Sequence, residues 1–454
     1  MSNSPVATGV APRHPIRRAL SFAVVALVVA VAVAAALVPR VVPGTLAGRD
    51  AGSLAAAVVF AASYFALALG KIPFLAIDRA GVALVGACLM VVAGALPLQE
   101  AYRAVDLDTI TLLLGMMIVV ASLRLSGFFA IATAWVMRRA HRPLVLLAAV
   151  ATTSAVFSAF LVNDAICLVL SPLVLDLTLA LKRRPAPYLL AVATASNVGS
   201  VATITGNPQN IMIGSFSRIP YTEFAAELAP VALAGLVLTI ALIALIHRRE
   251  FAGGARLAAP LPRIRANRFL IARALLATLA MVALFFAGQP PAKAAIIIGA
   301  LLLLTRRVRS ERVYAEIDWS LLLMFAGLFI IVAGAQHALL TPERIAAVGQ
   351  LHLDRAPVLS AVTAVLSNLV SNVPAVLVLK PFIAPLADPA RAWLTVAMAS
   401  TLAGNFTVLG SIANLIVVQR AAARGVVIGF GDYFLVGAPL TLLTLGLGTL
   451  WLMR

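Results

Sequence analysis

Two short polar sequences, each containing Asn and Gly, interrupt long apolar stretches of this chain. They are Thr205-Gly-Asn-Pro-Gln-Asn210 and Gly404-Asn-Phe-Thr-Val-Leu-Gly-Ser-Ile-Ala-Asn414. Pro208 removes a backbone donor and clashes with the preceding turn, so the first sequence cannot continue a helix. Free backbone groups inside a membrane are tolerated only where they are buried or line a cavity. Because exposed N–H ends attract anions and exposed carbonyl ends attract cations, each break predicts a site for an ion or small polar solute.

Two further polar pairs lie at the centres of apolar stretches that are too long for one membrane span. They are Asn163-Asp164 within 143–181 and Ser371-Asn372 within 355–387. Each stretch predicts a re-entrant hairpin with its tip at the polar pair. Asp164 is the only carboxylate near mid-membrane in this layout, and an intramembrane acid is expensive and by default functional. The alternative is that Asp164 only caps the returning helix.

We therefore expect one substrate or ion site between the two tips and the two breaks. Its candidate residues are Asn163, Asp164, Thr205, Gly206, Asn207, Asn210, Ser371, Asn372, Gly410, Ser411 and Asn414. The five His residues and the cysteines, Cys88 and Cys167, show no metal-ligand spacing. We expect no catalytic residue, no bound metal and no cofactor, apart from a Na⁺ or H⁺ that couples transport.

The composition indicates that membrane-spanning segments position these residues. The chain has 454 residues, 62% hydrophobic and 11% charged, with a mean hydropathy of +1.05. Soluble domains carry about 25% charged residues, and apolar runs of about 20 residues, long enough to cross a bilayer, recur along the chain. The net charge of +18 comes from Arg and Lys in short runs between apolar segments, as in membrane loops. The expected partner is thus the lipid bilayer and not nucleic acid.

The hydropathy pattern predicts an all-α polytopic membrane protein with about 11 transmembrane helices and two re-entrant hairpins. The predicted spans are 19–39, 52–70, 80–97, 109–137, 187–217, 225–247, 269–288, 293–305, 318–339, 391–419 and 433–452. Most Lys and Arg then fall on one side. This bias predicts a bacterial inner-membrane protein with its N-terminus in the cytoplasm and its C-terminus outside.

The two halves resemble each other in sequence. Asn163 to Leu173 aligns with Asn372 to Phe382, and Ser196 to Gly214 aligns with Ser400 to Val418. The halves run in opposite directions in the predicted topology, as in many secondary transporters. We therefore expect a cytoplasmic N-terminus and extra first helix over 1–50, inverted repeats over 51–250 and 269–454, and a cytoplasmic linker over 251–268.

The tip and break sequences together resemble the ion transporter superfamily, over about residues 50–454. The relevant branch holds arsenite permeases and citrate-transporter-like permeases, and divalent anion–sodium symporters are related more distantly. The resemblance implies a scaffold domain, a mobile transport domain with two hairpins and, in many members, a homodimer. The tip Val162-Asn163-Asp164 is closer to the arsenite-permease pattern than to the Ser-Asn-Thr tips of dicarboxylate symporters.

These features predict a secondary active transporter of a small anion or oxyacid, arsenite-like or another inorganic or organic anion. Coupling to a proton or sodium gradient and an elevator-type or alternating-access mechanism are expected. The alternative is a sodium–proton antiporter on the same scaffold. An enzyme would need a paired nucleophile and base or a metal cluster, and the sequence contains neither. A primary pump would need a Walker loop, which the chain lacks. The substrate, the coupling ion, the oligomeric state and any ATPase partner stay open.

Overall fold

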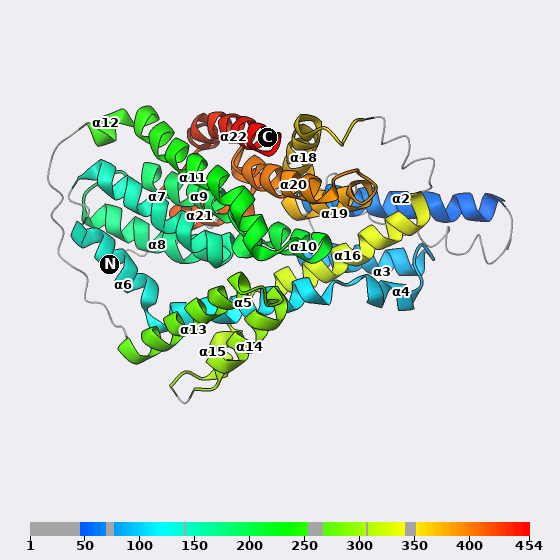
Figure 1. Cartoon of the computed structure of the whole chain (residues 1–454), viewed down its shortest axis with the longest axis horizontal. Helices are drawn as coiled ribbons and strands as arrows, with labels where there is room; N and C mark the ends of the chain where they lie inside the picture. Colours follow the sequence, from blue (N-terminus) through cyan, green and yellow to red (C-terminus); the bar gives the residue numbers. More distant parts are fainter. Residues whose placement is uncertain (1–45, 70–76, 140–141, 253–266, 306, 341–350) are drawn as a thin grey trace, which may run out of the picture. The chain divides into compact units, whose positions relative to one another are not determined.

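The computed structural model describes residues 46–69, 77–139, 142–252, 267–305, 307–340 and 351–454. All regular elements within these ranges are helices (Figure 1). The predicted first span, 19–39, and most of the predicted linker, 251–268, lie outside the described residues. The chain forms two compact units, 1–104 with 323–339 and 105–322 with 340–454. The predicted repeat boundaries stay a prediction, because these units group helices by contact and not by repeat.

The smaller unit is held together by close contacts between small residues. Its helices are α2 (Leu46–Leu69), α3 (Arg79–Val92), α4 (Leu98–Ala104) and the 323–339 part of α16 (Trp319–Leu339). Helices α3 and α16 approach so closely that a Cβ on Gly327 would lie 2.6 Å from the Ala83 carbonyl carbon. The Ser53 hydroxyl of α2 donates to the Ala338 carbonyl at 3.0 Å. Small residues allow this backbone approach, which is typical of membrane helices.

The larger unit begins with α5 (Leu107–Ser126) and α6 (Phe128–Arg139). We predicted a single span over 109–137, and this is wrong because Gly127 adopts φ 86°, a left-handed conformation that ends α5. Three further helices are α13 (Arg268–Phe286), α14 (Pro291–Leu303) and the short α15 (Ser310–Tyr314). Helix α14 packs directly on α5, since a Cβ on Gly115 would lie 2.5 Å from the Ala295 carbonyl carbon.

Both predicted hairpins are pairs of helices that lie side by side (Figure 1). The first consists of α7 (Pro143–Phe160) and α8 (Asn163–Ala180), and the second of α18 (Ala356–Val370) and α19 (Asn372–Ile383). The residue before each tip Asn has positive φ, 48° at Val162 and 79° at Ser371. Such backbone angles are uncommon outside glycine, so both tips turn through the same unusual conformation.

Both predicted breaks interrupt a helix with one short 3₁₀ turn. In the first half the order is α9 (Pro185–Ser200), η1 (Ile204–Gly206) and α10 (Pro208–Ser217). In the second half it is α20 (Pro389–Ala403), η2 (Val408–Gly410) and α21 (Ile412–Ala422). The second break therefore forms without a proline.

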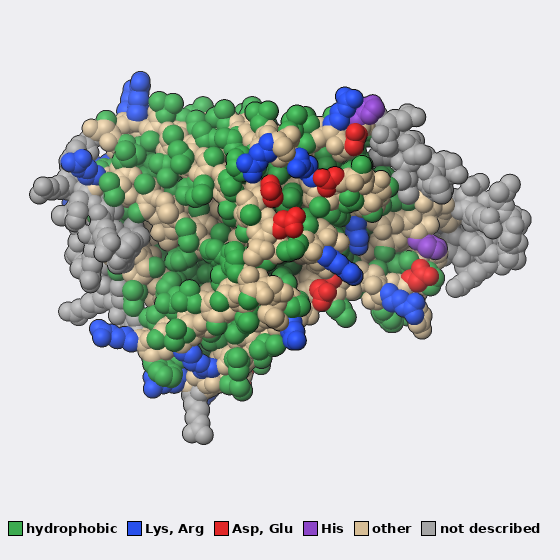
Figure 2. Space-filling model, in the orientation of Figure 1, with side chains coloured by type: hydrophobic (Ala, Val, Ile, Leu, Met, Phe, Trp, Pro, Cys, Tyr) green, Lys and Arg blue, Asp and Glu red, His purple; other side chains and the backbone are tan. Residues whose placement is uncertain are grey.

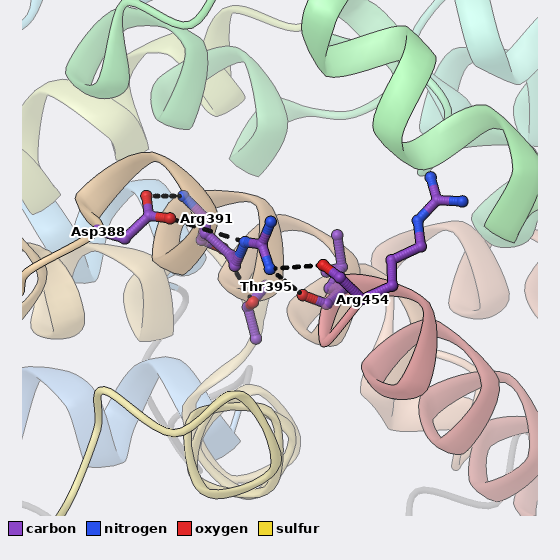
Figure 3. Close-up of polar contacts among 5 residues, drawn as sticks. Asp388, Arg391, Thr395 and Arg454 are labelled. Atoms are coloured by element: carbon purple, nitrogen blue, oxygen red, sulfur yellow. Dashed lines mark hydrogen bonds and ion pairs between the residues drawn. The ribbon is translucent and has the colours of Figure 1, made fainter.

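Each half ends with a long helix that contains one proline. These helices are α11 (Tyr221–Ile246) and α22 (Phe430–Leu452). The short α12 (Arg248–Phe251) follows α11. Arg391, in the first turn of α20, ties that helix to the end of α22 (Figure 3). Its guanidinium donates to the Leu452 carbonyl at 3.1 Å and to the Arg454 carbonyl at 2.9 Å. These bonds satisfy carbonyls that the end of a helix leaves free.

Hydrophobic side chains cover most of the visible face of the larger unit (Figure 2). Among the described residues, seven helices are long and apolar enough to cross a membrane, and six shorter helices are apolar. Large side chains such as Leu442 and Leu450 are 66% and 71% exposed. An apolar surface of this extent is suited to lipid, which agrees with the predicted polytopic membrane fold. The seven long helices include both helices of the first hairpin, so the predicted number of spans stays a prediction.

Candidate substrate site

The first break is closed by two asparagine side chains. Asn207 caps α10 by accepting a hydrogen bond from the Asn210 backbone N–H at 2.8 Å. The Asn210 amide donates at 3.0 Å to the carbonyl of Ser200, the last residue of α9, and at 3.0 Å to that of Thr203, which precedes η1. Both side chains are fully buried. The amides thus replace the backbone bonds that the break removes, as a buried break requires.

The second break repeats this arrangement with different residues. Ser411 caps α21 by accepting from the Ala413 backbone N–H at 3.3 Å. The Asn414 amide donates to the carbonyls of Gly404 at 2.7 Å and Thr407 at 3.1 Å. The two breaks therefore share a backbone path and one asparagine that holds it.

Glycine is required at one position of each break by the closeness of the preceding helix end. A Cβ on Gly206 would lie 2.1 Å from the Ser200 carbonyl oxygen, and one on Gly410 would lie 2.8 Å from that of Gly404. Both distances are shorter than real Cβ contacts, and the obstacles are backbone atoms that cannot swing away. The two predicted glycines therefore permit this close approach, and they offer only backbone groups to a ligand.

Two residues that we did not predict, Asn197 and Thr401, connect the breaks to each other. The Asn197 amide donates to Asn414 Oδ1 at 3.0 Å and accepts from the Ser411 hydroxyl at 3.2 Å. The Thr401 hydroxyl accepts from Asn207 Nδ2 at 3.1 Å. Asn197 and Thr401 directly follow the aligned residues Ser196 and Ser400. Because Asn and Thr are different residue types, identities between the halves do not reveal this pair.

Two further amides, Asn405 and Gln209, were not named as candidate site residues, although they lie inside the two predicted polar sequences. Asn405 Oδ1 accepts from Asn197 Nδ2 at 2.8 Å, and its own amide donates to the Thr194 carbonyl at 3.2 Å. Gln209 Nε2 donates to Thr401 Oγ1 at 3.1 Å. Gln209 lies inside the predicted polar sequence, so its polar side chain was a sign that it could belong to the site.

Both hairpin tips reach the same network. Asn163 Nδ2 donates to Asn197 Oδ1 at 2.9 Å. In the amide orientation that satisfies both ends of the Asn372 side chain, its nitrogen donates to the carbonyls of Ser400 at 3.1 Å and Gly410 at 3.2 Å, and its oxygen accepts from Gln209 Nε2 at 3.3 Å. We call this network the polar cluster; its members are Asn163, Asn197, Asn207, Gln209, Asn210, Asn372, Thr401, Asn405, Ser411 and Asn414. Every member is at most 8% exposed.

Three of the predicted site residues, Thr205, Ser371 and Asp164, are not members of the polar cluster. The Thr205 hydroxyl lies 2.8 Å from the Tyr221 hydroxyl, away from the cluster amides, while the Thr205 carbonyl accepts from the Val162 N–H at 3.3 Å. Ser371 forms the backbone turn of the second tip. Asp164, in the first turn of α8, lines a cavity of about 90 Å³.

Four charged residues line that cavity. Besides Asp164 it is lined by Arg124, Glu316 and Asp318, with apolar residues of α5, α8 and α21. Arg124 and Glu316 form an ion pair, with 39% and 26% of their side chains exposed. Asp318 accepts from the Leu321 N–H at 2.9 Å. The charged lining of this cavity therefore lies beside Asp164, whereas the neighbouring residue Asn163 hydrogen-bonds to the uncharged amide of Asn197.

The polar cluster itself is uncharged, since all of its members are amides or hydroxyls. Amides and hydroxyls both donate and accept hydrogen bonds, and the N-termini of α10 and α21 begin within the cluster, at Asn207 and Ser411. Helix N-termini favour negative charge, but by only about 0.3–1 kcal/mol at exposed sites. The arrangement suits a small solute that carries several hydroxyl groups and little net charge.

The fold and the paired breaks define the class, a multi-pass membrane transporter. The structure shares its fold with the YdaH transporter of Alcanivorax borkumensis, with a TM-score of 0.53 and 17% identity over 88% of this chain and 97% of that one. A family profile described as citrate transporter (CitMHS) matches residues 64–403, so the chain belongs to this family. This confirms the predicted resemblance to the ion transporter superfamily.

The names of two relatives mention solutes other than citrate. The chain is 29% identical to a silicon efflux transporter of Oryza sativa subsp. japonica, over 86% of this chain and 96% of that protein. It is 26% identical to an arsenical pump membrane protein of Yersinia enterocolitica, over 70% of this chain and 79% of that protein. These names describe transporters rather than enzymes.

Proposed function

We propose that this protein is a secondary active transporter of a small, hydroxylated inorganic acid, which binds in its neutral form. The observation that carries the proposal is the polar cluster, in which both breaks and both hairpin tips present only neutral donors and acceptors. Arsenous and silicic acids carry hydroxyl groups that can replace the bonds among these amides. The names of the rice and Yersinia relatives point to the same solutes.

A highly charged organic anion fits the cluster less well. Moving a charge out of water is expensive unless it is paired and hydrogen-bonded. Citrate would bring several carboxylates to ten neutral side chains and two helix N-termini, which offset little of that cost. Citrate transport would therefore require a bound cation or a Lys or Arg from elsewhere.

We further propose that Asp164 couples transport to a proton or sodium gradient. Neutralising the carboxylate with H⁺ or Na⁺ lowers the cost of moving it within the membrane. The cavity beside Asp164 provides room for water or a small cation next to the carboxylate. The two hairpins would then move as part of an elevator-type or alternating-access cycle.

The second candidate is a sodium–proton antiporter, and the acidic lining of the same cavity favours it. Asp164, Glu316 and Asp318 outnumber the single basic residue there, Arg124. In this alternative the polar cluster holds the transport helices together, and Na⁺ and H⁺ compete at Asp164.

A flux screen in inside-out vesicles distinguishes the candidates. Arsenous acid, silicic acid, sulfate, citrate and Na⁺ are supplied separately under an imposed proton or sodium gradient, with a pH-sensitive dye inside. Gradient-driven movement of arsenous or silicic acid is expected, and the empty-vector membrane is the control. Na⁺-dependent proton movement with no solute flux would instead establish the antiporter.

We also propose that the protein lies in a bacterial inner membrane with its N-terminus inside and its C-terminus outside, as a homodimer. The hairpins then enter from opposite faces, so single cysteines at Lys182 and Arg355 should react with impermeant reagents from opposite sides. Labelling of both positions from one side would contradict this inverted topology. Crosslinking in native membranes tests the dimer.

A further inference from the structure

Asn197 and Thr401 occupy equivalent places in α9 and α20, and each reaches into the break of the other half. Asn197 contacts Ser411 and Asn414, whereas Thr401 contacts Asn207 and, at 3.5 Å, Asn210. The partners are equivalent too, because Asn207 and Ser411 are the two caps and Asn210 and Asn414 hold the two backbone paths. Reciprocal contacts of this kind follow from a local two-fold relation between the halves.

We propose that Asn197 and Thr401 are positioning residues that join the two breaks into one substrate site. Each break is held by its own asparagine and also by one residue of the other half. A substrate that displaces the cap of one break therefore disturbs a side chain carried by the helix that leads into the other break, Thr401 of α20 for the cap Asn207 and Asn197 of α9 for the cap Ser411. The role in substrate binding rests on the proposed function, while the structural coupling of the breaks does not.

The two residues contribute unequally. Asn197 donates to Asn405 and Asn414 and accepts from Asn163 and Ser411, which uses four hydrogen bonds in a site that is 1% exposed. Thr401 accepts from two amides, those of Asn207 and Gln209, at 3.1 Å. The partners of both residues are buried, so the residue that makes more hydrogen bonds leaves more groups unsatisfied when it is removed. Removing Asn197 should therefore loosen the site more than removing Thr401 does.

Hydrogen–deuterium exchange on the purified protein tests the structural coupling across the halves. Thr401→Val keeps the side-chain shape and removes the hydroxyl, so amide exchange should rise roughly five- to tenfold in segment 203–217 of the other half. Asn197→Ala should produce a larger rise in segment 407–422. Thr401→Ser keeps the hydroxyl and should restore slow exchange.

Matched controls lie on the same two helices. The Thr395 hydroxyl bonds only within its own helix, to the Arg391 carbonyl, and the Thr194 hydroxyl likewise to that of Leu190. Thr395→Val and Thr194→Val should leave exchange at the opposite break unchanged. If Thr401→Val changes exchange only in α20, or changes it no more than Thr395→Val does, the two breaks are independent and the proposal fails. If Asn197→Ala does not purify, Asn197→Ser replaces it with a smaller expected rise.

Arsenous acid uptake then tests the role in binding. Thr401→Val should raise KM about tenfold and Thr401→Ser should restore it, because the hydroxyl positions the amides that bind substrate. An unchanged KM in Thr401→Val would contradict positioning. If the unmodified protein moves no arsenous or silicic acid, the proposed function fails, while exchange across the halves still decides whether Asn197 and Thr401 couple the breaks.

Discussion

The two breaks have nearly the same backbone but different side chains. Thr203 and Thr407, which precede the 3₁₀ turns, have φ of −142° and −135°, and Asn210 and Asn414 make equivalent pairs of hydrogen bonds. The first break nevertheless contains Asn207, Pro208 and Gln209 where the second contains Ser411, Ile412 and Ala413.

The hairpins differ in the same direction. Asp164 follows the first tip asparagine, and Val373 follows the second. The backbone of the repeat is therefore conserved between the halves, whereas acidic and amide groups are concentrated in the first. Under the proposed function, this asymmetry would allow one half to exchange a cation while both halves hold the substrate.

The largest expected effect comes from adding one methyl group to each break. Gly206→Ala would bring a Cβ to 2.1 Å from a backbone oxygen, and Gly410→Ala to 2.8 Å. We expect Gly206→Ala to lose about 3 kcal/mol or more of stability, and Gly410→Ala to lose less. Thermal unfolding in detergent measures both. Two variants that are equally stable, or as stable as the unmodified protein, would contradict the close approach.

The next effect should appear in both halves. Asn210→Ala and Asn414→Ala each leave two buried carbonyls without their side-chain donor. Each should cost about 2–4 kcal/mol of unfolding free energy. Similar losses of unfolding free energy would support the symmetry of the scaffold. A loss confined to one variant would contradict that symmetry. The same unfolding measurement decides between these outcomes.

A third test addresses the asymmetry. Asp164→Asn keeps the size and capping ability of the side chain, so the protein should fold, yet transport should lose its dependence on the proton or sodium gradient. Solute uptake is compared with and without the gradient. Full gradient-driven accumulation by Asp164→Asn would show that Asp164 only caps α8 and that coupling lies elsewhere.

The smallest effect is expected from the control carboxylate on the same helix. Asp176 forms an ion pair with Arg424 at 2.7 Å, and both side chains are more than half exposed. Exposed pairs contribute at most about 1 kcal/mol, so Asp176→Asn should retain gradient-driven uptake and nearly all of its stability. A loss of coupling in this variant as well would show that charge on α8, and not the position of Asp164, matters.

The sequence predicted the hairpins and breaks that form the site better than the residues that connect them. Apolar length located the hairpins, and Pro208, Gly206 and Gly410 located the breaks, because backbone rules act locally. Asn197 and Thr401 lie within regular helices, where one polar residue gives no local signal, and only their contacts across the halves reveal them. Gly127 was missed for a related reason, since an apolar stretch of suitable length masks a helix end inside it.

The central claim is that a small neutral acid binds the polar cluster. Binding of arsenous acid to the purified protein, measured by calorimetry at rising pH, tests it most directly, with the Asn197→Ala variant as the control. We expect binding that weakens as the acid ionises, about tenfold weaker binding in the variant, and no comparable binding of citrate. Binding that strengthens as the acid ionises, or that is unchanged in Asn197→Ala, would contradict the account.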